Sequence, residues 1–467
     1  MNRTVPVLAA MLLSGCAAVA DGPSPASVTV PERFAYADQP GSGVTDQRVV
    51  LANLLPEDDP AFVALVAAID GDAPDVQAAL ARVEAARAAL RTSRASRLPT
   101  VEAIGSAGVT RSSENAIVNQ IPGGAFDASS SLWSPGISAS WELDLFGRVK
   151  ASQRAATQRL NAADEDVRAV RLTLVADLAR AVIDYRTAQA KVRIAEEDLA
   201  EAKALSQLTG IRVRAGISPG FDLVTAQSLE AAALAARAPA EVELASALGS
   251  IVTLTARDGP TVALAFGAMP PEVKAASLPS VGLPSTLLRQ RPDVVAAEYR
   301  LTAANADIAA AAAARFPEFS ISATLGLAAI ALGDLFSADS LTASAGASIA
   351  GPLLDFGRVA AQIDARQADA KEAFAVYRGT VFRAIGEGET ALGTLRASRN
   401  RLTSLASQLA IEQDTVNLAR QRYRMGLSDF LSVVNVQRQL NVTRERFANA
   451  AGDVQRAEIE IYRSFGG

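Results

Sequence analysis

The sequence predicts a mainly α-helical chain with a small β part, in which one structural unit occurs twice. Three features of the 467 residues indicate this fold class. Motifs recur at a constant spacing, two long stretches lack proline, and four short segments alternate between apolar and polar residues. Hydrophobic residues make up 49% of the chain and aromatic residues only 5%, so small side chains must build the helix interfaces.

The repetition is an ordered series. Two motifs recur 210 residues later, Phe146-Gly147-Arg148-Val149 as Phe356-Gly357-Arg358-Val359 and Arg214-Ala215-Gly216-Ile217-Ser218 as Arg424-Met425-Gly426-Leu427-Ser428. Upstream, Pro74-Asp75-Val76 recurs as Pro292-Asp293-Val294 at an offset of 218. The offset changes between Pro99 and Phe146, which places a longer loop there in the first copy. We therefore expect a duplicated chain, with a first repeat at 61–256, a linker at 257–291 and a second repeat at 292–467.

The N-terminus has the pattern of a targeting segment. Arg3 supplies positive charge, and the apolar stretch that follows is too short to span a membrane. The only cysteine, Cys16, follows small residues and resembles the cysteine of a bacterial lipobox. We expect residues 1–15 to be a signal peptide, Cys16 to carry a lipid, and residues 16–60 to form a lipidated tether and extended segment. Ala17 favours the outer membrane; an ordinary secretory signal with a chance cysteine is the alternative.

Each repeat is expected to begin with a helix about 38 Å long, over Pro74–Leu98 and Pro292–Phe316. Proline suits the first helical position, and an aspartate after it suits the positive end of the helix. The next proline ends each helix.

Period-2 alternation follows in both copies, in hairpins predicted at 100–145 and 318–354. Apolar residues such as Val101, Ala103 and Ile321 alternate with small polar ones such as Ser106 and Ser320. Strands of about ten residues with one apolar and one polar face are typical of outer-membrane barrels. A soluble hairpin is the alternative, and Pro135 weakens the prediction for the second strand.

The third part of each repeat is a long helix, predicted at 147–213 and 358–424. A heptad pattern with small residues runs along both stretches, and about 67 residues make a helix of roughly 100 Å. Gly216 and Gly426 break the two helices. Returning helices are expected at about 222–256 and 430–464.

The composition excludes several kinds of chemistry. With no histidine and one cysteine, the chain has no histidine-dependent triad, no internal disulfide and no cysteine cluster for a metal. The net charge of −5 gives no basic surface for nucleic acid. We expect no enzymatic activity, no metal and no cofactor; nothing resembles a phosphate-binding loop, and the acidic side chains suggest solvated helix faces.

Four strands cannot close a membrane barrel, because the smallest such barrels have eight, and open edges are not tolerated in lipid. If these strands span a membrane, the chain must form an oligomer. Two copies leave little lumen, so a conduit requires three or more.

In its duplicated order of hairpin, Phe-Gly-Arg, long helix, Arg-x-x-Gly and returning helix, the chain resembles the TolC-type outer-membrane efflux factors. A narrower resemblance to the lipoprotein branch that includes OprM and NodT lies in three motifs and in Cys16: Leu283-Pro284-Ser285, Arg289-Gln290-Arg291-Pro292-Asp293-Val294 and Arg315-Phe316-Pro317. It implies a homotrimer with an α-barrel in the periplasm and a shared twelve-stranded barrel in the outer membrane. It also implies a periplasmic adaptor and a resistance-nodulation-division pump as partners, with drugs or other small molecules as cargo.

The resemblance further assigns roles at the two turns after the long helices. It implies that the tips contact the adaptor, through Arg214, Gly216, Ser218, Arg424, Gly426, Leu427 and Ser428. It also implies that the helix starts just after the tips line the closed aperture. We expect the aperture or gate residues to be Asp222, Tyr423, Ser432, Asn435 and Arg438. The family often carries carboxylates at the positions of Ser432 and Asn435, so this chain departs there. Asp222 keeps its acid and is expected to supply three carboxylates around the trimer axis; solvated helix ends are the alternative.

Three competing functions remain open. An outer-membrane factor for type I protein secretion shares the same architecture, and a secretion ATPase encoded nearby would favour it. A structural coiled-coil lipoprotein explains the helices and Cys16 but not two equivalent alternating hairpins. A periplasmic enzyme built on paired carboxylates is opposed by their scattered positions.

Overall fold

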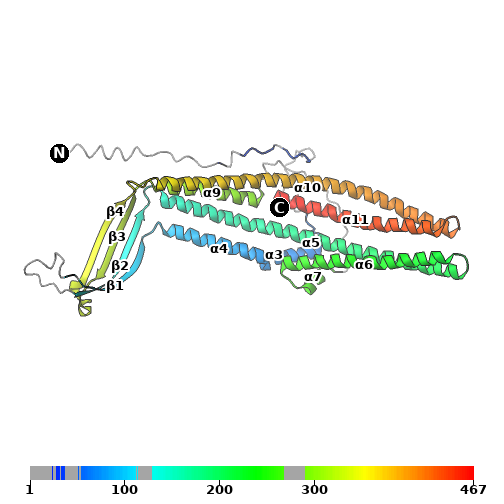
Figure 1. Ribbon diagram of the computed structural model, residues 1–467, viewed down its shortest axis with the longest axis horizontal. Coiled ribbons are helices and arrows are strands. Elements are labelled where there is room, and N and C mark those ends of the chain that lie inside the picture. Colours follow the sequence, from blue (N-terminus) through cyan, green and yellow to red (C-terminus); the bar gives the residue numbers. More distant parts are fainter. Residues whose placement is uncertain are drawn as a thin grey trace, which may run out of the picture. The chain divides into compact units, whose positions relative to one another are not determined.

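The computed structural model describes residues 24, 28–31, 33–36, 51, 54–111, 113, 129–267 and 290–467 (Figure 1). Several predicted features lie outside these residues: the signal peptide, Cys16, most of the tether, Leu283-Pro284-Ser285 and Arg289. The chain divides into two compact units, and each draws on both repeats. Residues 83–162 and 297–377 form the strand unit, and residues 28–82, 163–296 and 378–467 form the helical unit. Within the described residues, no helix has the length and apolar character needed to cross a membrane.

A four-stranded antiparallel sheet is the centre of the strand unit. Its strands are β1 (Thr100–Arg111), β2 (Ser129–Leu143), β3 (Glu318–Leu327) and β4 (Leu341–Ala350), and they lie in the order β1-β2-β3-β4 (Figure 1). The alternating segments thus form strands as predicted. Pro135 does not interrupt β2 but lies within it, opposite Gly105 of β1.

The register keeps the apolar and polar residues on opposite faces of the sheet. Every pair joins two odd-numbered or two even-numbered residues, as in Ile137↔Leu325 and Ser138↔Thr324. On the even-numbered face, serine hydroxyls meet across strands, Ser106 with Ser134 at 2.9 Å and Ser320 with Ser348 at 2.7 Å. The predicted division into one apolar and one polar face is therefore present in the sheet, with Ile104 and Leu132 as apolar exceptions on the even-numbered face.

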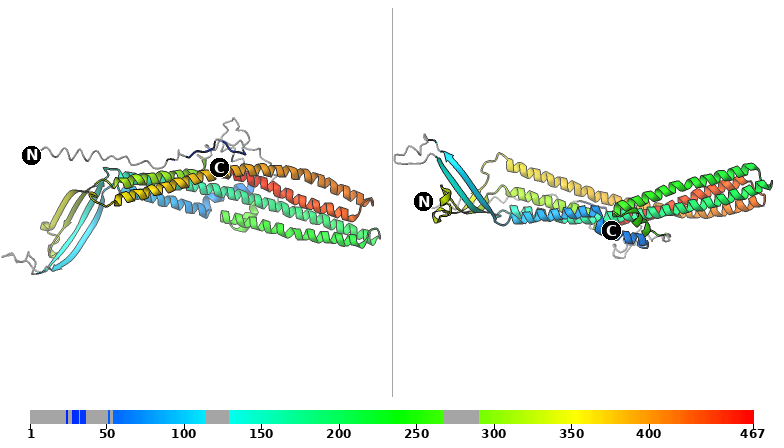
Figure 2. Two further views of the ribbon diagram at one scale, coloured as in Figure 1. Left: turned by 45° about the horizontal axis from the view of Figure 1, so that its top comes forward. Right: turned by 90° about the horizontal axis from the view of Figure 1, so that it is seen from below.

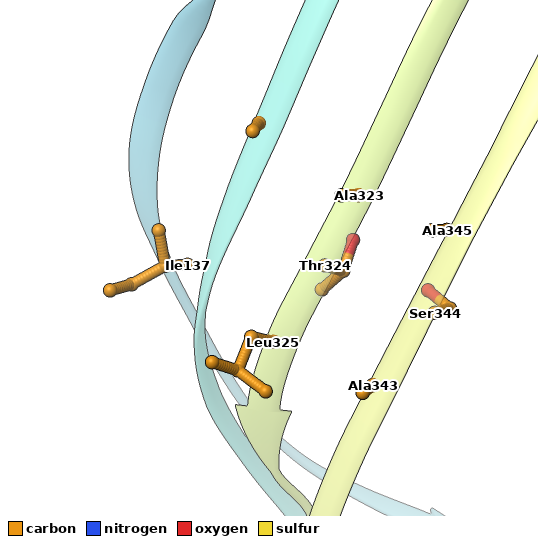
Figure 3. Close-up of a pocket in the computed structure, with 8 residues that line it drawn as sticks. Ile137, Ala323, Thr324, Leu325, Ala343, Ser344 and Ala345 are labelled. Atoms are coloured by element: carbon orange, nitrogen blue, oxygen red, sulfur yellow. The ribbon is translucent and has the colours of Figure 1, made fainter.

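The apolar face is uneven, because alanines alternate with larger side chains. Figure 3 shows Ile137 and Leu325 beside Ala323, Ala343 and Ala345, on three neighbouring strands. A shallow depression of about 400 Å³ lies over these residues.

The base of the sheet is tied to the long helices by caps and aromatic contacts. The carboxylate of Asp144 accepts hydrogen bonds from the backbone N–H groups of Val149 and Lys150, and Asp355 accepts them from Gly357 and Val359 in the second copy. The ring of Phe146 stacks on Phe316 with centroids 4.6 Å apart.

Antiparallel helix pairs make up most of the helical unit. Helix α5 (Arg148–Arg214) pairs with α6 (Gly220–Thr255), and α10 (Arg358–Arg424) pairs with α11 (Phe430–Phe465) (Figure 2). Both long helices have 67 residues. Helix α5 begins and ends one residue later than predicted, whereas α10 begins and ends at the predicted residues. Two short helices, α3 (Pro60–Asp72) and α7 (Gly259–Ala265), were not predicted individually.

The first helix of each repeat is shorter than expected. Helix α4 covers Pro74–Ala95 and α9 covers Pro292–Ala313, whereas the predictions extended to Leu98 and Phe316. In both copies the last three residues form a turn, as in the hydrogen bond from the Leu98 N–H to the Ala95 carbonyl. The proline that follows disfavours the helical conformation of the residue before it.

The core of the helical unit is aliphatic and small, with buried residues such as Ile69, Leu178, Ile251 and Ile459. One buried ion pair lies beside it, where Arg186 donates to both carboxylate oxygens of Asp59 at 2.8 and 3.0 Å. Of the predicted tether, residues 33–36 pack on this unit. Phe34 is buried against Phe465, and Glu389 accepts the N–H of Ala35 at 2.7 Å.

Candidate functional site at the helix turns

The two turns that follow the long helices have the same geometry. In the first, the N–H of Gly216 bonds the Val213 carbonyl and the N–H of Ile217 bonds that of Arg212. In the second, Gly426 bonds Tyr423 and Leu427 bonds Arg422. Both glycines are left-handed, with φ of 70° and 73°. This is the Schellman arrangement, which requires glycine because a Cβ is unfavourable at positive φ.

Tyr423 joins the two turns. Its side chain is 7% exposed and packs on Phe430, with ring centroids 5.4 Å apart. Its hydroxyl lies 3.3 Å from the hydroxyl of Ser218 in the other turn. The guanidinium of Arg212 lies over the Tyr423 ring at 4.8 Å and also donates to Ser218. A residue of the second hairpin is therefore held by two residues of the first.

Two carboxylates face this junction. Asp222, in the first turn of α6, is half-buried, and Asp429 caps α11 by accepting the Ser432 N–H at 2.9 Å. Burial raises the pKa of Asp222, and the charge of Asp429 raises it further, while Arg212 lowers it. The hydrogen bonds from Ser432 lower the pKa of Asp429. The tip cluster, defined as Arg212, Ser218, Asp222, Tyr423 and Asp429, thus combines two acids with one base.

The residues predicted for the tips and for the gate are only partly brought together. Ser218, Asp222 and Tyr423 belong to the tip cluster, and Ser432 binds Asp429. Asn435 and Arg438 are exposed on α11, and Arg214, Gly216, Arg424, Gly426 and Leu427 are exposed at the turns. The hydroxyl oxygen of Ser428 is buried and has no partner within the described chain.

A second polar group, farther from the turns, was missed by the sequence reasoning. We call Asp198, Glu201, Arg420, Gln437 and Arg444 the charge cluster. It links three helices, because Arg420 of α10 and Arg444 of α11 both bind carboxylates of α5. The distances are 2.7 Å from Arg420 to Glu201 and 2.8 Å from Arg444 to Asp198. Gln437 accepts from Arg420 at 2.7 Å and donates to Glu201 at 3.1 Å.

The two acids of the charge cluster have opposite pKa shifts. Burial raises the pKa of Asp198 to about 6, although Arg444 opposes the shift. Burial also acts on Glu201, but the hydrogen bond from Arg420 and the charges of Arg444 and Arg420 outweigh it, so that the pKa of Glu201 is lowered. Among the described residues, no group of acidic side chains is placed to hold a metal ion.

Three features together define an outer-membrane efflux channel. They are the repeated long-helix hairpins, the four-stranded sheet with one apolar and one polar face, and the two matched helix turns. A family model described as outer membrane efflux protein matches residues 66–257 and 283–467, and the chain therefore belongs to this family. The predicted family, its fold class, its location in the outer membrane and its function as the outer-membrane channel of a tripartite efflux pump are confirmed at this level.

Individual relatives agree along the whole chain. The solvent efflux pump outer membrane protein SrpC of Pseudomonas putida is 30% identical over 100% of this chain and 98% of its own length. The cation efflux system protein CusC of Escherichia coli K12 is 28% identical over 100% of this chain and 99% of its own. The structure of the outer-membrane channel OprN has a TM-score of 0.84 and 31% identity, covering 96% of this chain and 98% of that one.

Proposed function

We propose that three copies of this chain form a passive conduit for small molecules such as drugs and toxic compounds. The conduit receives its cargo from a periplasmic adaptor and an inner-membrane pump of the resistance-nodulation-division class. A lipid on Cys16 anchors it to the outer membrane. The chain itself performs no chemistry, so the transport energy comes from the pump.

The observation that carries this proposal is the open sheet. Strands β1 and β4 form the two ends of the four-stranded order, and each pairs with one neighbour only. An open edge is not tolerated in lipid, so further strands must come from other copies. Two copies give eight strands, which leave little lumen, whereas three give twelve and a passage.

Unpartnered apolar side chains on the helices support assembly as well. In the single chain, Phe221 and Val224 of α6 and Ile411 and Leu418 of α10 are exposed. Apolar surface of this kind is stabilised when a second copy covers it.

The polar face of the sheet indicates which kind of cargo the conduit can pass. Its central residues are small and uncharged, among them Ser134, Ser138, Thr324 and Ser344. A wall of hydroxyl groups selects weakly by charge, which suits varied small molecules. SrpC is named for solvents and CusC for cations, so relatives of this chain carry different cargo.

The turns are the surface offered to the adaptor. Ile217, Met425 and Leu427 are exposed there beside Arg214 and Arg424, which gives an apolar surface with a basic rim. Gly216, Ser218, Gly426 and Ser428 shape the same two turns. In the trimer, Asp222, Tyr423, Ser432, Asn435 and Arg438 line the closed aperture, and adaptor contact opens it by rearranging the helix ends.

Conductance of the purified trimer in a planar lipid bilayer tests the gate. The wild type is expected to conduct weakly, and Asp222→Ala is expected to raise the conductance severalfold, because the electrostatic attraction between Asp222 and Arg212 is lost at the junction. Glu241→Ala, on the same helix but paired with Arg237 away from the turn, is the control and is expected to leave it unchanged. Equal conductance of wild type and Asp222→Ala would remove Asp222 from the gate.

Two further outcomes separate the alternatives. Protein export would be indicated if the purified trimer bound a secretion ATPase complex and not a resistance-nodulation-division pump with its adaptor. An elongated monomer after removal of the lipid would indicate a structural lipoprotein.

A further inference from the structure

Basic side chains gather at one end of the sheet. The pairs Thr100↔Ser140 and Glu318↔Ala350, with the pairing of β2 and β3 between them, place all four connections from strand to helix at the same end (Figure 1). We call it the helix end of the sheet. Six exposed side chains lie within about two helical turns of these connections, and they form the basic rim: Arg91, Arg94, Lys150, Arg154, Arg315 and Arg358.

The charge of the basic rim is not neutralised inside the chain. Four nearby carboxylates are already engaged, since Glu142 and Glu318 pair with Arg148, and Asp144 and Asp355 cap the two long helices. Over the described residues, no side chain of the basic rim forms a salt bridge. The rim therefore presents positive charge to a partner outside the chain.

The far end of the sheet has a different balance of charge. Among the described residues there, Asp334 and Asp339 lie in the loop between β3 and β4, and Arg111 at the end of β1 is the one base. Because the excess of basic side chains is confined to the helix end, the partner that it fits belongs to that side of the sheet.

The two tryptophans of the chain mark the level of the membrane surface. Trp133 and Trp141 lie on the odd-numbered, apolar face of β2, eight residues or about 27 Å apart along the strand. Tryptophan is enriched at membrane–water interfaces, and the apolar band of a membrane barrel is about 25 Å tall. The indole N–H of Trp141 donates to the carbonyl of Arg97 at 2.9 Å, three residues after Arg94. The helix end of the sheet therefore lies at one membrane surface.

The depth of the basic rim fits the headgroup layer. Lys150 and Arg154 follow the first residue of α5 by two and six residues, which is about 3 and 9 Å along the helix. The headgroup layer on one side of a bilayer is about 5–8 Å thick. Long basic side chains span the remaining distance, because their stems extend toward the charged groups that they bind.

Exposed apolar side chains lie in the same connections. Leu145 is 61% exposed between β2 and α5, and Leu354 and Phe356 are 75% and 91% exposed between β4 and α10. Apolar side chains beside basic ones are the combination that binds a membrane surface. The apolar atoms enter the acyl region, whereas the charges stay among the headgroups.

We propose that the basic rim binds the phosphate groups of anionic phospholipids in the periplasmic leaflet of the outer membrane. Arginine suits this partner, because its planar guanidinium donates two parallel hydrogen bonds to a phosphate. The acyl chains of the same lipids cover Leu145, Leu354 and Phe356. This binding requires the location of the chain in the outer membrane and no particular number of copies.

Lipid retention by the full-length protein tests the binding. Protein purified in mild detergent is mixed with equal amounts of phosphatidylglycerol and phosphatidylethanolamine that carry the same acyl chains, and the retained lipids are counted by native mass spectrometry. The wild type is expected to retain phosphatidylglycerol roughly five times better. Raising the ammonium acetate concentration from about 50 to about 500 mM is expected to reduce this preference, because salt screens the charges. Equal retention of the two lipids by the wild type would overturn the proposal.

A triple variant removes half of the basic rim. Arg94→Gln, Lys150→Gln and Arg154→Gln together are expected to bring the preference to within about twofold of equal retention. The matched control removes the same charge from exposed positions of the helical unit and is expected to keep the wild-type preference: Lys203→Gln, Arg396→Gln and Arg446→Gln. The same preference in both triple variants would contradict a lipid site at the rim.

Two other partners give different results. If the basic rim meets carboxylates of a neighbouring copy instead, the rim variant dissociates into single chains at a lower temperature in lipid-free detergent and keeps the lipid preference of the wild type. If the rim is a site for free anions, glycerol phosphate displaces phosphatidylglycerol at equal concentration, although it has no acyl chains. Either result would overturn the proposal, which predicts neither.

Discussion

The carboxyl group of Asp198 lies where α5, α10 and α11 share the charge cluster. Its side chain is 10% exposed, receives a hydrogen bond from Arg444, and has Glu197 and Glu201 as acidic neighbours. Burial with one base and two further acids nearby explains why its pKa rises to about 6 from an ordinary value of 3.8. Near neutral pH, ionisation of Asp198 therefore costs more free energy in the folded protein than in the unfolded chain.

This shift predicts a pH dependence with a defined sign. Between about pH 4 and pH 6 the folded protein holds a proton on Asp198 that the unfolded chain has lost, so stability falls as the pH rises. Asp198→Asn keeps a neutral side chain at every pH. It is expected to raise the thermal midpoint at pH 7.5, with a gain of at most about 3 kcal/mol in the free energy of unfolding. At pH 4 it is expected to change the thermal midpoint little.

The control is the neighbouring Glu201, whose pKa is lowered. The contribution of Glu201 to stability is present above its pKa in the unfolded chain and is lost as the pH falls through its pKa in the folded protein. Glu201→Gln is therefore expected to lower the thermal midpoint at pH 7.5, because Arg420 and Arg444 lose a carboxylate. A pH-independent effect of Asp198→Asn would contradict the assigned shift.

At this scale, sequence reasoning recovered Ser218, Asp222 and Tyr423 of the tip cluster but missed Arg212 and Asp429. It also interpreted the charged residues of the helices as solvated faces, whereas Asp198 and Arg444 are largely buried together. The two lie 246 residues apart, and no local pattern connects a carboxylate on one helix with a base on another.

Among the secondary-structure elements, the helix turns show how local sequence fixes a tip. Gly426 adopts φ of 73°, and a Cβ there would meet no atom within 4 Å, so the cost of a side chain lies in the backbone alone. That cost is roughly 1–2 kcal/mol.

Gly426→Ala is therefore expected to loosen the turn. Hydrogen exchange of the amides of residues 422–427 should become roughly 5- to 30-fold faster, as measured by mass spectrometry of peptides over the turn. Gly379→Ala is the matched control, because Gly379 lies exposed in the helical interior of α10. There alanine is expected to stabilise by about 0.5–1 kcal/mol and to slow local exchange. Unchanged exchange at the turn in Gly426→Ala would contradict a glycine requirement.

The long elements were predictable because their ends carry strong signals. Both long helices begin at the arginine of a Phe-Gly-Arg motif and end two residues before a glycine, and their 67 residues follow from these limits. The strands followed from alternation alone, even at Pro135. Helices α3 and α7 are held by packing on the buried aliphatic core. They are too short for a periodic pattern in their own residues to predict them.

For the whole molecule, the duplication explains why a single chain is incomplete. Each repeat supplies one hairpin, the internal junction joins two hairpins, and the outer edges of β1 and β4 remain for other copies. The sequence predicted this incompleteness from the strand count, and the two-faced sheet supports it. The number of copies depends on contacts between chains, so the fold of one chain does not contain it.

Native mass spectrometry of the full-length protein, extracted from outer membranes in mild detergent, tests the central claim most directly. A passive conduit with twelve shared strands predicts an assembly of three chains as the dominant species. A monomer, or a dimer with only eight strands, would contradict the account.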